Sequence, residues 1–209
     1  MIDYAENGLP RFFNEVPTIT MFDPLAQLLG GAKAGLFTYR YEDAVKLAGH
    51  SCPTGAGAYL MLLRGLAALY PEGQPRRGGI EVQMSNGRDV GTTGVIASIV
   101  TLITGAATEL GFAGLGGRIE RRRDLLSFAG HFEGVFSLKR RDNGQQVRVS
   151  YNPDFVPFAP EISALLPKVI GEEASATELE QFGQLWQQRV QAILTEQRDD
   201  PRLVTVQRL

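Results

Sequence analysis

The chain has 209 residues, of which 44% are hydrophobic and 21% charged, a composition typical of a folded globular protein and unlike that of a disordered chain. Its single cysteine excludes an internal disulfide framework and a four-cysteine zinc module within one chain. With 21 basic and 23 acidic residues, the chain has no general attraction for nucleic acid or an anionic membrane, so we expect neither as a partner.

Targeting and membrane signals are not expected. The N-terminal residues 1–11 include Asp3 and Glu6 and lack the apolar core of a secretory signal. The longest apolar stretch, residues 95–107, is interrupted by polar residues and is shorter than the roughly 20 residues of a membrane span. We therefore expect a buried helix there and a cytoplasmic protein.

In the first half of the chain, spacing and turn residues predict alternating helices and strands. Asp23 and Pro24 are typical of an N-cap and the first residue of a short helix, and the aromatic residues of 36–41 indicate a strand. Residues 42–47 predict one or two helical turns. Further predicted elements are a long helix from Pro53 to about 70, a strand at 80–84, and an apolar helix that Thr92 and Thr93 cap and that ends near Gly105.

The second half predicts strands followed by helices. The expected strands are 125–131, 135–140 and 147–151, with a tight Asp142-Asn143-Gly144 turn between the last two. The expected later elements are helices at 161–170 and 177–197 and an edge strand or dimer contact at 203–206. This order predicts an α+β fold: a mixed or antiparallel sheet packed with helices over 1–152, and a helical C-terminal extension over 153–209.

The sharpest chemical signal lies just before the long helix, in His50-Ser51-Cys52-Pro53. A proline at the first helical position makes Cys52 the N-cap, over unpaired backbone N–H groups and the positive end of the helix dipole. A cysteine placed there is predicted to be more reactive than an ordinary thiol. His50 supplies a second metal ligand or a proton partner, while Gly55 and Gly57 are predicted to give a ligand close access to the helix backbone.

A metal at this point needs more donors than the segment supplies. Zinc takes four ligands in a structural site, or three and a water in a catalytic one. The other histidine of the chain, His131, is a third candidate, although a surface role is the more common fate of such a residue. Further candidate carboxylates are Glu81, Asp89 and Asp124. We expect zinc or another divalent transition metal, if bound, to occupy an open site with water.

Three other polar or aromatic features are weaker signals. The loop 85–94, with Thr92 and Thr93 at the entrance of a helix, fits an anion or cofactor site, but a plain capped loop is the simpler interpretation. The basic run of Arg118 and residues 121–123 is interpreted as a solvated face. Phe182 and Trp186 are four residues apart and predict core or interface contacts.

The 49–53 segment, together with the alanine- and glycine-rich helix after it, resembles the signature of the FmdE family, whose name comes from a component of formylmethanofuran dehydrogenase. That signature runs approximately H-G-H-x-C-P-G. Residues 103–105 resemble the L-T-G that ends a helix in that family, and 144–149 resemble its G-x-x-x-R-V hairpin segment. The resemblance covers residues 42–151.

The resemblance implies an α+β core, a homodimer, and a cleft around His50 and Cys52 that binds a metal or small ligand. Some family members carry a C-terminal zinc finger, which the single cysteine of this chain excludes. The chain departs from the family pattern at four positions. Where the family has a histidine, a glycine, a cysteine and an aspartate, this chain has Ala48, Thr54, Val95 and Ser98, respectively.

These observations favour an FmdE-like metal- or small-ligand-binding protein, accessory to a metalloenzyme or a transport system, with His50 and Cys52 in its cleft. One alternative is a thiol-dependent enzyme, with Cys52 as nucleophile and His50 as base. Another is a structural or assembly protein whose C-terminal helices and last strand form a dimer. The expected partners are a metal or small molecule and a second copy of the chain.

Overall fold

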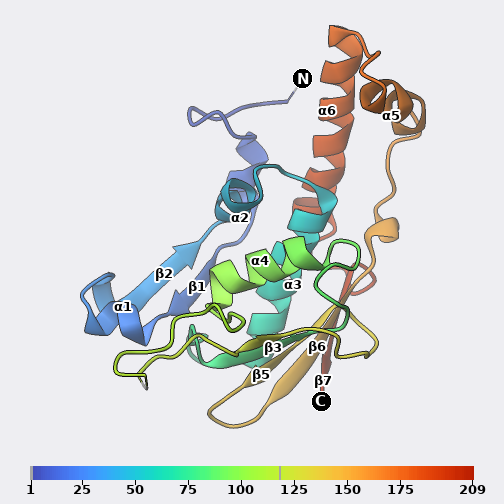
Figure 1. The fold of residues 1–209 in the computed structure, drawn as a ribbon. Helices are drawn as coiled ribbons and strands as arrows, with labels where there is room; N and C mark the ends of the chain where they lie inside the picture. Colours follow the sequence, from blue (N-terminus) through green and yellow to red (C-terminus); the bar gives the residue numbers. More distant parts are fainter. Residues whose placement is uncertain (1, 118) are drawn as a thin grey trace.

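A computed structural model describes residues 2–117 and 119–209 and shows the expected α+β fold (Figure 1). A mixed five-stranded sheet has the order β4-β3-β5-β6-β7, and β1 and β2 form a separate antiparallel pair. The strands are β1 (Ile19–Phe22), β2 (Leu36–Tyr39), β3 (Ile80–Met84), β4 (Leu126–Ser127), β5 (Phe136–Arg140), β6 (Gln146–Tyr151) and β7 (Val204–Arg208). The helices are α1 (Pro24–Leu28), α2 (Tyr41–Ala48), α3 (Pro53–Leu69), α4 (Thr93–Thr104), α5 (Ile162–Ile170) and α6 (Ala176–Gln191).

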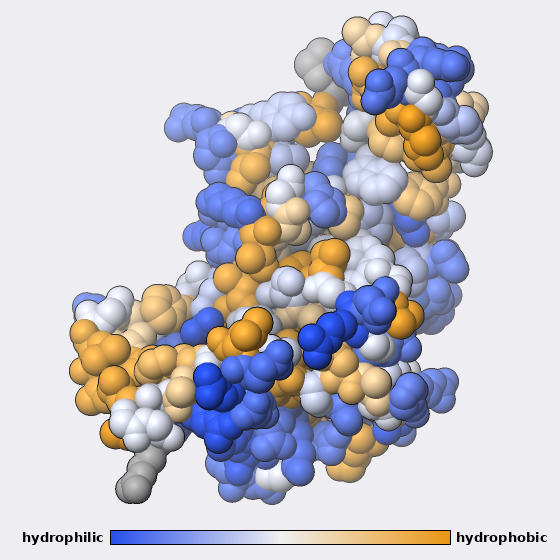
Figure 2. Space-filling view, in the orientation of Figure 1, coloured by the Kyte–Doolittle hydropathy of each residue, from blue (hydrophilic) through white to orange (hydrophobic). Residues whose placement is uncertain are grey.

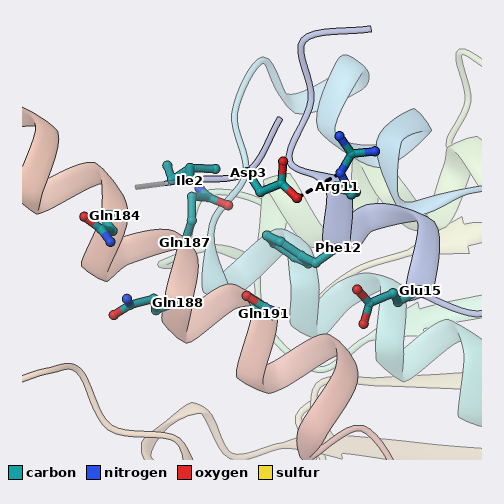
Figure 3. A pocket seen from close by; sticks show the side chains of 9 residues that line it. All are labelled: Ile2, Asp3, Arg11, Phe12, Glu15, Gln184, Gln187, Gln188 and Gln191. Carbon is teal, nitrogen blue, oxygen red and sulfur yellow. Dashed lines mark hydrogen bonds and ion pairs between the residues drawn. The ribbon is translucent and has the colours of Figure 1, made fainter. Parts of the chain in front are cut away.

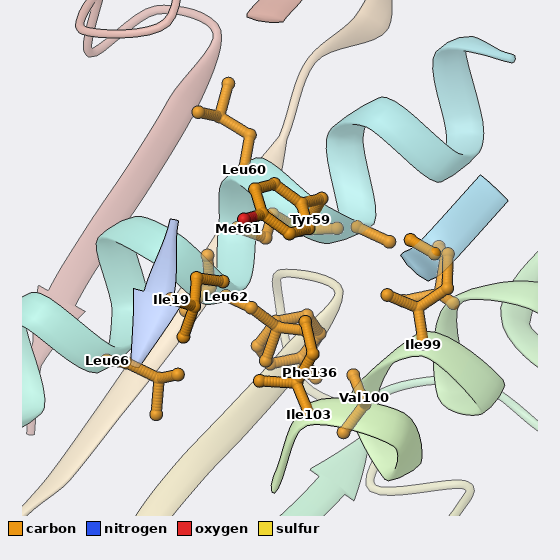
Figure 4. Packing of buried hydrophobic residues seen from close by; sticks show 14 of the residues in the cluster. Ile19, Tyr59, Leu60, Met61, Leu62, Leu66, Ile99, Val100, Ile103 and Phe136 are labelled. Atoms are coloured by element: carbon orange, nitrogen blue, oxygen red, sulfur yellow. The ribbon is translucent and has the colours of Figure 1, made fainter. Parts of the chain in front are cut away.

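The core lies between the large sheet and the helices α3 and α4, which cover one of its faces (Figure 1). Strand β3 alternates buried and exposed residues, because one face meets the helices and the other meets solvent. Helix α3 is buried along most of its length and comes close to the sheet at Gly65, where an added Cβ would lie 3.0 Å from Val149. Figure 4 shows α3 and α4 side chains meeting Phe136 of β5 and Ile19 of β1.

The β1–β2 pair and α1 form an arm that extends away from the sheet (Figure 1). Its outer end is fixed by Asp23, which caps α1 and accepts hydrogen bonds from two arginines, Arg77 at 3.0 Å and Arg122 at 2.6 Å. Arg122 is buried, so the prediction of a solvated face is wrong at this residue, because a carboxylate 99 positions earlier pairs with it. Arg118 of the same run lies outside the described residues.

The C-terminal segment contributes both to a protruding helical pair and to the central core. Helices α5 and α6 extend beyond the body of the molecule (Figure 1). A short π-helical stretch follows α6, and its residues Ile193 and Leu194 are fully buried together with Val190. Strand β7 then pairs with β6 at the sheet edge, as the 203–206 pattern predicts. Residues 153–209 thus supply core side chains as well as helices.

Several elements match their sequence predictions and two differ. The α1 cap, the starts of α3 and α4, strand β3 and the β5–β6 hairpin are confirmed. The strand expected over 125–131 is only two residues long, because Ala129 and His131 have positive φ angles that end the extended chain. Thr92 occupies the N-cap position of α4, but its side chain makes no capping hydrogen bond. Within residues 2–117 and 119–209, no helix is both long and apolar enough to cross a membrane.

Candidate functional site

Cys52 is the N-cap of α3, as the following proline predicts. Its backbone is extended, Pro53 is the first helical residue, and the Cys52 Sγ accepts the Gly55 N–H at 3.3 Å. The sulfur therefore lies over the N-terminus of a 17-residue helix. Cys52 is buried, with 8% of the residue exposed.

His50 lies on the connection between α2 and α3, and its imidazole is exposed. It follows Gly49, which ends α2 in the left-handed conformation that glycine adopts most easily. The His50 Nδ1 is 2.9 Å from the Ala48 carbonyl oxygen. Because a carbonyl oxygen only accepts, Nδ1 donates, and the neutral ring carries its free lone pair on Nε2. A histidine held in this way is oriented as metal-binding histidines usually are.

Ser51, between these two residues, is tied to α2 and α6. Its carbonyl oxygen accepts hydrogen bonds from Trp186 Nε1 and Gln187 Nε2, each at 3.1 Å. Its hydroxyl donates to Gln187 Oε1 at 3.0 Å and lies 3.1 Å from the Tyr41 hydroxyl. The segment is thus fixed by side chains that lie far from it in the sequence. Tyr41 is 10 residues before Ser51, and Trp186 and Gln187 are about 135 residues after it, so the local sequence does not reveal their importance.

Two tyrosines complete the surroundings of the α3 N-terminus. The Tyr151 hydroxyl donates to the Pro53 carbonyl at 2.9 Å. Burial raises the pKa of both the Tyr41 and Tyr151 hydroxyls, which keeps them protonated as hydrogen-bond donors. The Tyr151 ring also lies against Gly57, where an added Cβ would overlap it. The space beside Gly57 is therefore taken by protein atoms.

Gly55 has a looser environment than Gly57. An added Cβ there would lie 3.9 Å from the Cys52 Sγ, the Tyr41 hydroxyl oxygen and the Ile99 side chain, which is ordinary van der Waals distance. Gly55 is nevertheless buried, and its direct part in the site is the N–H that it donates to the sulfur.

The other proposed metal donors are spread over separate elements. His131 is exposed in the loop after β4, where its backbone N–H bonds to the Ser85 carbonyl. Asp124 pairs with Arg121, and Glu81 on β3 is 3.9 Å from Arg141. Among residues 2–117 and 119–209, no group of three or more histidine, cysteine, aspartate or glutamate side chains is placed to hold a metal. His50 and Cys52, by contrast, are two residues apart on the connection between α2 and α3.

The proposed anion or cofactor site at the start of α4 consists of an exposed and a buried residue. Thr93 is the first residue of the helix and is buried, whereas Thr92 is exposed. The nearby Arg88 lies over the Phe128 ring at 5.6 Å, which directs the guanidinium toward the protein's own aromatic side chain. A surface pocket along α4 is lined by Gly94, Ala97 and Ser98 among others, and neither of these two threonines nor Cys52 is part of its lining.

A cavity of about 250 Å³ separates α6 from the N-terminal segment (Figure 3). One wall is formed by glutamines of α6, and the other by the N-terminal residues with Phe12 and the Asp3–Arg11 ion pair. Its lining residues are Ile2, Asp3, Arg11, Phe12, Glu15, Gln184, Gln187, Gln188 and Gln191. Gln187 belongs both to this wall and to the hydrogen bonds on Ser51.

Comparison with known proteins finds no protein-family model that matches the chain and no curated protein with significant similarity to it. A functional assignment must therefore come from the residues themselves. The feature that stands out is a histidine with an oriented ring, two residues before a cysteine at a helix N-terminus.

Proposed function

We propose that this protein binds a divalent transition metal, with zinc as the first candidate, or a small ligand, through His50 and Cys52, as FmdE-like proteins are expected to do. The observation that carries the proposal is the His50 Nδ1–H bond to the Ala48 carbonyl, which leaves Nε2 free on an exposed ring. Imidazole nitrogen and thiolate sulfur are both ligands that zinc prefers.

The two donors account for half of a four-coordinate site. Solvent, a small-molecule substrate or a side chain of a second copy would supply the remaining positions. When bound there, the metal would act as a Lewis acid or a template on which a ligand is held. The protein itself contributes the oriented imidazole, the sulfur over the helix N-terminus, and the hydrogen bonds that fix Ser51 between them.

Elemental analysis of purified, tag-free protein tests the proposal directly. The wild type is expected to retain or take up close to one equivalent of zinc per chain from a metal-containing buffer. Cys52→Ala and His50→Ala are each expected to lose most of it, because each removes one of only two protein donors. His131→Ala is the matched control, because that histidine is also exposed but lies on a different loop. Equal metal content in wild type and Cys52→Ala would refute the proposal.

The thiol-enzyme alternative is less well supported by the geometry. The Cys52 Sγ is hydrogen-bonded to a backbone N–H, and the His50 Nδ1 to a backbone carbonyl, so no hydrogen bond between described atoms joins the two side chains. A nucleophilic cysteine needs a base within hydrogen-bond reach. Stoichiometric iodoacetamide labelling that is fast near neutral pH and slowed by His50→Ala would reopen this alternative.

A specific observation also favours self-association, the third possibility. Exposed apolar side chains lie on the protruding α5–α6 pair, among them Ile170, which is 73% exposed, and Leu179. Figure 2 shows hydrophobic residues on this end of the molecule. We propose that two copies form a homodimer through this surface. Light scattering should show a dimer for the wild type and a monomer for an Ile170→Glu/Leu179→Glu variant; the same mass for both would exclude this interface.

A further inference from the structure

The peptide between the two proposed ligands is held by more hydrogen bonds than its neighbours are. The Ser51 carbonyl accepts two bonds from α6, and the Ser51 hydroxyl bonds to the same helix and to Tyr41. His50 and Cys52 are joined directly to this peptide, so any rotation of Ser51 changes the separation and direction of the imidazole and the thiol. The preceding Gly49 gives the chain little stiffness of its own.

Helix α6 is itself firmly anchored where it reaches Ser51. The Trp186 ring is stacked on Phe182 with centroids 5.5 Å apart, and it packs against Phe158 at 5.2 Å. Three residues later, the buried Arg189 donates to the Val156 and Pro153 carbonyls, each at 2.6 Å. A donor on α6 therefore has a fixed position relative to the core, which is what a positioning group requires.

Two hydrogen bonds to Ser51 fix the orientation of the Gln187 amide. Its Nε2 can only donate and is used on the Ser51 carbonyl, while its Oε1 can only accept and is used on the Ser51 hydroxyl. A glutamate in this place would keep the acceptor and lose the donor. The hydrogen bonds thus specify glutamine at this position.

We propose that Trp186 and Gln187 are positioning residues of the His50–Cys52 site, so that α6 is part of the site although it supplies no ligand. Their hydrogen bonds fix the Ser51 peptide, and the imidazole and the thiol belong to the residues on either side of it. The metal-binding half of this inference rests on the proposed function; the control of the Cys52 thiol does not.

The chain offers two clean probes for the test. Cys52 is its only cysteine and Trp186 its only tryptophan, so iodoacetamide alkylation reports on that thiol alone, and fluorescence excited beyond the tyrosine absorption reports on that ring alone. The variants are Trp186→Phe, which keeps the aromatic stack and removes one donor, and Gln187→Ala. Gln188→Ala is the matched control, because it is the next residue of the same helix and makes no hydrogen bond to Ser51 among the described contacts.

In the full chain, we expect Trp186→Phe and Gln187→Ala to raise the rate of Cys52 alkylation several-fold, because Cys52 is buried in the wild type and a loosened Ser51 peptide would give the reagent access to it. Zinc affinity should fall roughly tenfold or more, the usual effect of removing a group that orients a ligand. The Co²⁺–thiolate charge-transfer band of the cobalt-loaded protein should shift or weaken as well. Gln188→Ala should match the wild type in all three measurements, and zinc should change the fluorescence of the wild type.

The outcomes separate this inference from the proposed function. Unchanged alkylation, affinity and cobalt spectrum in Trp186→Phe and Gln187→Ala would overturn the positioning role. If the wild type binds no zinc, the proposed function fails, and the alkylation rates alone decide whether α6 controls the thiol. Variants that melt at a lower temperature but keep the wild-type cobalt band would be merely less stable, and that pattern too would count against positioning. Trp186→Phe retains the aromatic packing and so guards against misfolding.

Discussion

Replacing Asp23 by asparagine tests the buried ionic contact at the α1 end of the arm. The Asp23 side chain is 4% exposed, and its two oxygens accept hydrogen bonds from Arg77 and from Arg122, which is 7% exposed. Asparagine keeps an oxygen for the α1 cap but removes the charge, so two guanidinium groups lose their shared carboxylate. Arg77 Nε and Arg122 Nη1 already lack partners, which leaves little alternative bonding for these cations.

The expected magnitude follows from the burial of the pair. Breaking a buried ion pair by removing one partner costs about 3–5 kcal/mol. For a chain of this size, a change of 1 kcal/mol moves the melting temperature by about 2–4 °C, so Asp23→Asn should melt roughly 6–20 °C lower. Asp3→Asn is the control, because its pair with Arg11 is exposed and should contribute less than about 1 kcal/mol.

The assay is thermal and urea unfolding followed by circular dichroism at several pH values. Burial by itself would raise the pKa of Asp23, but the hydrogen bond from Arg77 and the charge of Arg122 outweigh it and hold that pKa below its usual range. The carboxylate therefore stabilises the fold above about pH 4, and its contribution is lost as the pH falls through the lowered pKa. Wild type and Asp23→Asn should converge in acid. A difference below about 1 kcal/mol at pH 7, or one that is constant with pH, would refute the reasoning.

Two further predictions concern helix packing and the α5–α6 pair. Gly57→Ala should destabilise the fold by roughly 1–3 kcal/mol in urea unfolding, because the added Cβ would overlap the Tyr151 ring. Gly65→Ala should cost less, since the nearest neighbours of its added Cβ are 3.0 Å or more away. Equal costs for the two variants would contradict this reasoning. Hydrogen bonds from Lys168 and Ser175 lower the pKa of Glu178 to about 2, so ¹³C NMR should find this carboxyl ionised at pH 3, and titration above pH 4 would be inconsistent with those contacts.

Local signals were sufficient to predict the elements that carry the site. Pro53 after Cys52 fixes the N-cap, and Gly105 ends α4 in the left-handed conformation typical of a helix C-terminus. Gly144 supplies the positive φ that the β5–β6 turn needs. In each case, one or two residues restrict the backbone strongly enough to determine the local conformation without any contact from a distant part of the chain.

The contacts that the sequence did not predict join residues far apart in the chain. Arg122 belongs to a run that is typical of a solvated face, and only its contact with Asp23 explains its burial. Trp186 has the spacing of a packing residue, but its indole N–H has a partner 135 positions away. Strand β1 has only four residues, too few to show a clear alternation, so it is defined by pairing with β2. Such partners emerge from the tertiary arrangement and leave no local periodicity.

The placement of Val190, Ile193 and Leu194 against α3 has a consequence for synthesis. A ribosome makes α3 more than a hundred residues before these partners, so the apolar helix leaves the exit tunnel with part of its surface uncovered. The peptide that carries the thiol is likewise without its α6 donors during that interval. Complete packing of α3 therefore has to wait until its C-terminal partners are made. During that interval, the exposed apolar surface of α3 is a binding site for chaperones that shield nascent chains.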